Sequence, residues 1–131
     1  MKIKKTLSGI LLAGILTLLG CKNYSLPYYN GKIGEDSVYS ARETAHIADG
    51  WFSRNYLEVR KQDGRKVEFL DFNKDLRLDK VVKSENGISA YYDNTDAYGR
   101  MVLEKSQRDF EYYLTMIEWK KMNLYDRGLE N

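Results

Sequence analysis

The chain has 131 residues, which is enough for one domain and too few for two. Its formal net charge is +2, but three of its 21 basic residues precede Cys21, so the remainder carries 18 basic and 19 acidic side chains. A nearly neutral domain has no field that would attract nucleic acid, so nucleic-acid binding is excluded from the expected functions. A single cysteine also excludes an internal disulfide, and packing alone must stabilise the fold.

Residues 1–20 have the pattern of an export signal. Met1–Lys5 is basic, and the run Ile10–Leu19 is almost entirely apolar. A helix that spans a bilayer needs about 20 apolar residues, roughly twice the length of this run. The segment is therefore predicted to be a signal peptide that is removed from the mature protein.

The end of this signal carries a recognisable motif. Leu18-Leu19-Gly20-Cys21 resembles the lipobox of bacterial lipoproteins, Leu-x-(Gly/Ala)-Cys. The resemblance implies cleavage before Cys21, attachment of acyl chains such as palmitate to its thiol, and anchoring in a lipid bilayer of the cell envelope. Lys22, rather than aspartate, follows the cysteine. For a Gram-negative lipoprotein this implies the outer membrane, and in an organism with one membrane it implies the outer face of the cell membrane. The alternative is an ordinary secretory signal that ends at an unmodified cysteine.

The segment after Cys21 is polar and rich in tyrosine. It contains Pro27 and two glycines, so residues 21–34 are predicted to be a lipidated tether, followed by a single α+β domain over residues 35–131. Residues 35–52 are ambiguous, because Ser40–Ala48 fits either a short helix or an additional strand that leads into Trp51.

The pair Asp63-Gly64 lies between two alternating segments and predicts a β-hairpin. A three-residue loop that ends in a left-handed glycine places Val59 opposite Val67 and Leu57 opposite Phe69. This register gathers the apolar side chains on one face of the sheet, whereas a two-residue loop does not.

Asn86-Gly87 predicts a second hairpin of the same kind. The same loop type pairs Val82 with Ala90 and Val81 with Tyr91. The two hairpins together predict four antiparallel strands, near Tyr56–Lys61, Arg65–Asp71, Asp79–Ser84 and Gly87–Tyr92.

The apolar period changes in the segment Gly99–Asp126. Apolar side chains recur there at steps of three, four and seven residues, which is typical of an amphipathic helix: Leu103, Phe110, Leu114, Ile117 and Leu124. The predicted fold is therefore α+β, an antiparallel β-meander of four or five strands packed against a long C-terminal helix.

The loop between the second and third of these strands concentrates oxygen-bearing side chains. Calcium prefers six to eight oxygen ligands. The loop offers them at positions 1, 3, 5 and 9 and a backbone carbonyl at position 7, which makes five candidate ligands: Asp71, Asn73, Asp75, Arg77 (through its carbonyl) and Asp79.

The loop resembles the calcium loops of the integrin-α/FG-GAP class, which join two antiparallel strands. It is less similar to an EF-hand, because Val82 stands where an EF-hand has glutamate. Position 6 of such loops is normally glycine, since the chain turns there with positive φ, and Leu76 meets a steric penalty at that position. The alternative is a polar hairpin loop whose Asp and Asn side chains cap their own backbone amides.

No pattern in the sequence indicates catalysis. His46 is the sole histidine, Cys21 is assigned to the anchor, and no nucleophile or phosphate-binding motif is present. The expected function is a membrane-anchored, non-catalytic binding or structural module of the cell envelope, with calcium as a candidate stabilising ion and an envelope protein or glycan as partner. The alternatives are a small envelope hydrolase and an inhibitor or immunity-type lipoprotein.

Overall fold

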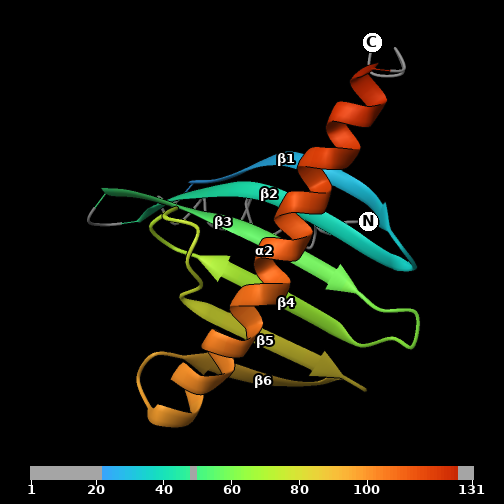
Figure 1. Ribbon diagram of the computed structural model, residues 1–131. Helices are drawn as coiled ribbons and strands as arrows, with labels where there is room; N and C mark the ends of the chain where they lie inside the picture. Colours follow the sequence, from blue (N-terminus) through green and yellow to red (C-terminus); the bar gives the residue numbers. More distant parts are fainter. Residues whose placement is uncertain (1–21, 48–49, 127–131) are drawn as a thin grey trace.

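A computed structural model describes residues 22–47 and 50–126. Within them, a six-stranded antiparallel sheet has its strands in chain order, and the helix α2 (Ala97–Asp126) crosses one face of it diagonally (Figure 1). The strands are β1 (Lys22–Ile33), β2 (Asp36–Ile47), β3 (Gly50–Arg60), β4 (Lys66–Asp71), β5 (Lys80–Glu85) and β6 (Ile88–Asp93). The predicted α+β meander with a long C-terminal helix is confirmed, and the sheet has more strands than the four or five expected.

The largest difference from the prediction lies in the segment that was expected to be a tether. Lys22–Ile33 instead forms β1, which pairs with β2 from Lys22 opposite His46 to Ile33 opposite Asp36. Pro27 is tolerated because β1 is an edge strand, and the register shifts between Pro27 and Tyr29. Burial of Ile33 ties the end of this strand to the core. The described fold therefore begins at Lys22 and not at residue 35, and Ser40–Ile47 is strand rather than helix.

The first hairpin has the predicted register. Leu57 is opposite Phe69 and Val59 is opposite Val67. Gly64 takes a φ of 95°, and its amide donates to the carbonyl of Lys61 at 3.1 Å. The three-residue loop is therefore confirmed.

The predicted register of the second hairpin is wrong by one residue. Val81 is opposite Tyr92 rather than Tyr91, and Val82 is opposite Tyr91 rather than Ala90. Because side chains alternate between the two faces of a strand, the shift brings Tyr92, and not Tyr91, to the face that carries the buried Val81.

The loop length explains this shift. Glu85 pairs with Ile88, so only two residues form the turn. Both have positive φ, 54° for Asn86 and 78° for Gly87, as a type I′ turn requires. Asparagine tolerates the left-handed conformation well, so the shorter loop is accessible here.

The beginning of α2 is set by two residues. The carboxylate of Asp96 accepts a hydrogen bond from the amide of Gly99 at 2.6 Å, which caps the first turn of the helix. A Cβ atom at Gly99 would lie 2.0 Å from the carbonyl oxygen of Asp93, so only glycine fits there. The helix thus begins close to the end of β6.

The core lies between α2 and the sheet. Leu57, Phe69 and Val81 contribute from the strands, and Phe110 and Ile117 contribute from the helix. The rings of Phe69 and Phe110 stack with their centroids 5.8 Å apart. The predicted helical stripe is therefore the packing face, although the side chain of its last member, Leu124, lies outside those described. In the described part of the chain, no helix has both the length and the apolar character needed to cross a bilayer.

Candidate functional site

The loop between β4 and β5 curls around the carboxylate of Asp71. This side chain is fully buried, with 0% exposure. Its Oδ2 accepts hydrogen bonds from the amide of Leu76 at 2.8 Å and from the Asn55 side chain at 3.3 Å, and its Oδ1 accepts one from the amide of Asp75 at 3.3 Å. The carboxylate thus organises the backbone of the loop.

The two other aspartates of the loop also accept hydrogen bonds from backbone amides. Asp79 Oδ2 accepts from the amide of Phe72 at 2.7 Å, and Asp75 Oδ1 accepts from that of Arg77 at 2.9 Å. These bonds are the capping pattern of a polar hairpin loop. The described residues hold no group of three or more His, Cys, Asp or Glu arranged to bind a metal ion. The calcium assignment of Asp71, Asn73, Asp75, Arg77 and Asp79 stays a prediction.

The backbone of the loop nevertheless has the curvature expected at position 6. Leu76 takes a φ of 68°, and Lys74 takes a φ of 57°. Gln107 of α2 holds this turn in place, because its side chain accepts from the amide of Leu78 and donates to the carbonyl of Leu76, both at 2.9 Å. The left-handed turn at Leu76 is therefore held by contacts with the helix.

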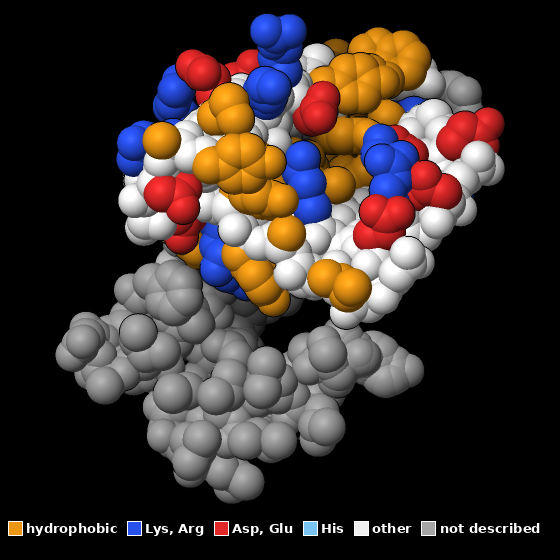
Figure 2. Space-filling view, turned by 90° about the horizontal axis from the view of Figure 1, so that it is seen from below, with side chains coloured by type: hydrophobic (Ala, Val, Ile, Leu, Met, Phe, Trp, Pro, Cys, Tyr) orange, Lys and Arg blue, Asp and Glu red, His pale blue; other side chains and the backbone are white. Residues whose placement is uncertain are grey.

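A groove of about 840 Å³ lies beside α2 on the same face of the sheet. Its apolar and aromatic lining comes from the sheet and from the helix, and includes Val67, Phe69, Ala90, Tyr92, Tyr112 and Tyr113. Charged side chains that also line it are Lys61, Arg65, Lys66, Lys83, Glu85 and Asp109. Figure 2 shows hydrophobic side chains gathered around a hollow on this side of the molecule, with charged side chains of both signs beside it. Sequence patterns could not reveal this groove, because strands and helix meet there only in the folded chain.

A polar triad stands at one side of the groove. Lys61 Nζ donates to Tyr113 Oη and to Asp36 Oδ2, both at 3.1 Å, and the Tyr113 hydroxyl donates to the same Asp36 oxygen at 2.7 Å. Burial opposes the charge on Asp36, but the hydrogen bonds from Tyr113 and Lys61 outweigh it, so the pKa of the Asp36 carboxyl lies below its usual value. The hydrogen bond to Tyr113, with that to Asp36, raises the pKa of the Lys61 ammonium.

Two lysines of the groove lie over aromatic rings. Lys61 Nζ is 5.8 Å from the centroid of the Tyr113 ring, and Lys83 Nζ is 6.0 Å from that of Tyr92. Such cation–π contacts hold the ammonium groups beside the tyrosines. The groove therefore offers aromatic surface and positive charge side by side.

The opposite face of the sheet carries two glutamates around one tyrosine. The hydroxyl of Tyr56 lies 2.6 Å from Glu68 Oε2 and 2.8 Å from Glu58 Oε1. Burial, and then the negative charges of Glu58 and Glu68, raise the pKa of Tyr56. Tyr56 lines a smaller cavity of about 360 Å³, whose described lining includes neither glutamate. The cluster is thus a hydrogen-bond network between neighbouring strands. The alternation of the sequence places these three residues on one face of the sheet, but it does not distinguish them from the other polar residues there.

No family model, curated protein or solved structure matches this chain. Cys21 and the side chain of His46 lie outside what the structure describes.

The hydrogen bonds of the loop predict that Asp71→Ala lowers the free energy of unfolding by about 2 kcal/mol in the presence of EDTA, because buried donors lose their acceptor. Urea unfolding of the mature domain measures this, with the exposed Asn73→Ala as control.

The calcium hypothesis adds a separate expectation, a rise in Tm in millimolar calcium that Asp75→Ala abolishes. A Tm that is the same with and without millimolar calcium would reject the calcium hypothesis.

The lowered pKa of Asp36 predicts a loss of stability in acid. The ionised Asp36 carboxylate contributes to the free energy of unfolding. This contribution is fully present above the unfolded pKa of about 3.9 and is lost as the pH falls through the lower pKa of the folded state. The difference in unfolding free energy between wild type and Asp36→Asn should therefore be large at pH 6 and smaller near pH 2.5. Urea titrations at both pH values measure it, with Glu35→Gln, at the exposed neighbouring position, as control. A difference that does not change with pH contradicts this role.

Proposed function

We propose that this chain is a lipid-anchored protein of the cell envelope whose small, non-catalytic domain binds a partner through the groove beside α2. The anchor rests on Leu18-Leu19-Gly20-Cys21, where the only cysteine of the chain stands at the position that lipidation requires. Two or three acyl chains would make the attachment lasting, since each buried methylene contributes roughly 0.8 kcal/mol. Lys22 after the cysteine supports the outer membrane as the location in a Gram-negative cell.

The single observation that carries a binding role is the chemistry of the groove. Tyr92, Tyr112 and Tyr113 line it together with apolar side chains of the strands. Tyrosine offers a large apolar ring and a polar tip, which suits surfaces that contact proteins or glycans. Lys83 adds positive charge beside the Tyr92 ring, while Lys61 is paired with Asp36. The partner class is therefore a protein or glycan of the envelope, with oxygen-rich groups that Lys83 would contact.

A small envelope hydrolase is the second candidate. It is favoured by Glu58 and Glu68, whose carboxylates both lie within hydrogen-bond distance of the Tyr56 hydroxyl. Most glycoside hydrolases use a pair of carboxyl groups that flanks the scissile bond as their catalytic residues. Both glutamates are instead engaged by Tyr56, and further contacts join Glu58 to Arg60 and Glu68 to Lys66. The binding module is therefore the better-supported function.

The anchor is tested by the intact mass of the full chain isolated from bacterial membranes. We expect cleavage before Cys21 and a mass increase that corresponds to two or three acyl chains. Cys21→Ser should abolish both, while Ser25→Ala, four residues further along, should leave both unchanged. An unmodified thiol, with the protein in the soluble fraction, would overturn the proposal.

The groove is tested with two matched variants of α2. Tyr112 lines the groove and Trp119 does not, yet both are exposed aromatic residues, at 54% and 56%. Tyr112→Ala should weaken, by about fivefold or more, the retention of envelope proteins or glycan fragments on the immobilised domain, since an aromatic contact of this kind contributes more than about 1 kcal/mol. Trp119→Ala should not. Equal retention by both variants would remove the groove as the binding surface.

A further inference from the structure

We infer that the end of the sheet at which β1 begins lies against the lipid bilayer, and that the loop between β4 and β5 contacts the phospholipid headgroups. The inference rests on the proposed lipidation of Cys21 and adds an orientation and a second membrane contact. It comes from the position of β1, from the side chains that the loop exposes, and from their common location in the fold.

The proposed anchor is joined to the sheet without intervening residues. β1 begins at Lys22, the residue directly after Cys21, and Lys22 is paired with His46 of β2. Consecutive Cα atoms are only 3.8 Å apart. An acylated Cys21 would therefore hold this end of the sheet at the membrane surface, which the tether expected from the sequence would not have done.

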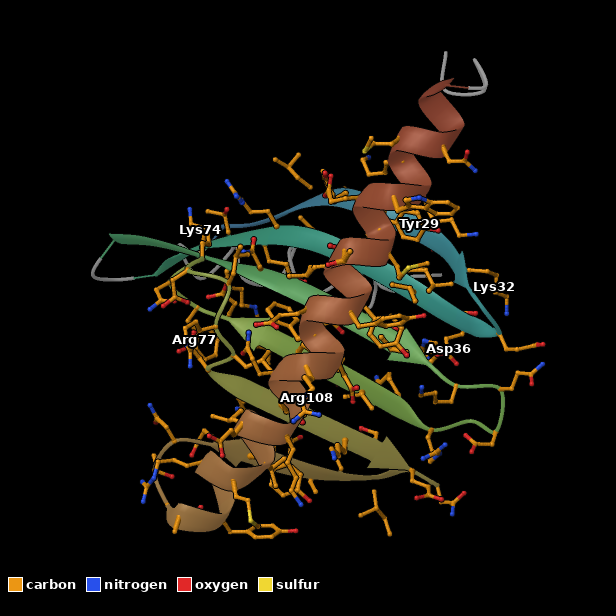
Figure 3. The ribbon with its side chains drawn as sticks, in the orientation of Figure 1. Tyr29, Lys32, Asp36, Lys74, Arg77 and Arg108 are labelled. Carbon is orange, nitrogen blue, oxygen red and sulfur yellow. The ribbon has the colours of Figure 1, made fainter. Side chains whose placement is uncertain are left out.

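The loop between β4 and β5 lies at the same end of the sheet as the start of β1 (Figure 1). Figure 1 shows the start of β1, the adjoining ends of β2 and β3, and the connection between β4 and β5 at the same end of the sheet. In Figure 3, Lys74 and Arg77 lie at that end, whereas Lys32 and Asp36 lie at the other.

The loop exposes both apolar and basic side chains to its surroundings. The exposed side chains include two apolar ones, Phe72 at 40% and Leu76 at 56%, and two basic ones, Lys74 and Arg77. Asn73 and Asp75 are exposed as well, and one oxygen of Asp75 accepts a hydrogen bond from the amide of Arg77. Asp71 is buried, and Asp79 is half-buried and accepts a hydrogen bond from the amide of Phe72. Apolar and basic groups together match the region between acyl chains and anionic headgroups.

The left-handed conformation of Leu76 supports the same interpretation. A φ of 68° disfavours a branched side chain, and glycine would relieve the strain. The side chain is nevertheless leucine and is directed outward. Contact with lipid gives such a side chain an apolar environment that water does not.

The orientation also places the groove. Arg65 and Glu85 line it and belong to the ends of the β3–β4 and β5–β6 hairpins, at the far end of the sheet from the start of β1 (Figure 1). A domain that rests on its β1 end would hold the groove away from the bilayer. A partner in the envelope could then reach it without competing with lipid.

The experiment uses the single cysteine of the chain. Because lipid occupies the thiol of Cys21, an introduced cysteine is the only site for a thiol-reactive fluorophore. The full acylated chain carries Leu76→Cys in the loop or Gln62→Cys in the exposed β3–β4 turn, and is reconstituted in vesicles of phosphatidylethanolamine and phosphatidylglycerol. Nitroxide-labelled headgroups should quench the fluorophore at position 76 at least threefold more than at position 62. Lys74→Cys repeats the measurement in case a change at Leu76 alters the loop.

The outcomes separate the two proposals. Equal quenching at the loop and at position 62, in protein whose intact mass shows the acyl chains, overturns the orientation and leaves the anchor standing. An unacylated mass overturns both. Charge reversal in the loop, Lys74→Glu with Arg77→Glu, should reduce the difference in quenching, while Lys32→Glu at the opposite end should not.

Discussion

The packing of one helix on one face of the sheet is the interaction on which the other features depend. Phe110 is fully buried and stacks on Phe69, and Ile117 continues the same contact along α2. A single helix cannot cover a six-stranded sheet completely. Its diagonal course leaves a groove on one side, while on the other side Gln107 reaches the loop between β4 and β5.

Polar contacts then give the helix a defined position, which apolar packing alone specifies less tightly. Tyr113 joins α2 to Asp36 and Lys61, and thereby to the beginning of β2 and the end of β3. Gln107 joins it to backbone groups of the loop. Each contact satisfies partly buried polar groups that would otherwise oppose folding. The groove and the loop are consequently held by the same rigid element, at opposite ends of the sheet.

This arrangement suits a protein that is proposed to act at a surface. An edge strand that begins directly after Cys21, the proposed site of lipid attachment, would transmit the position of the membrane to the whole sheet, because antiparallel pairing is continuous from β1 to β6. The loop between β4 and β5, near the start of β1, exposes two apolar side chains, Phe72 and Leu76, beside charged ones, whereas the groove at the other end combines tyrosines with charges of both signs. The two ends thus differ in chemistry as their proposed partners do.

The sequence by itself determined what local chemistry encodes: the four strands that became β3 to β6, the long helix after them, and the register of the first hairpin, where Gly64 and the alternation of Val59 and Val67 agree. It also indicated the positive φ of Leu76. Only the tertiary structure decided the rest. The polar segment before Ile33 became a strand because β2 supplies its hydrogen-bond partners, and Tyr113 met Asp36 across 77 positions because α2 turns back over the sheet. Local patterns encode backbone dihedrals, but contacts between distant segments depend on the path of the whole chain.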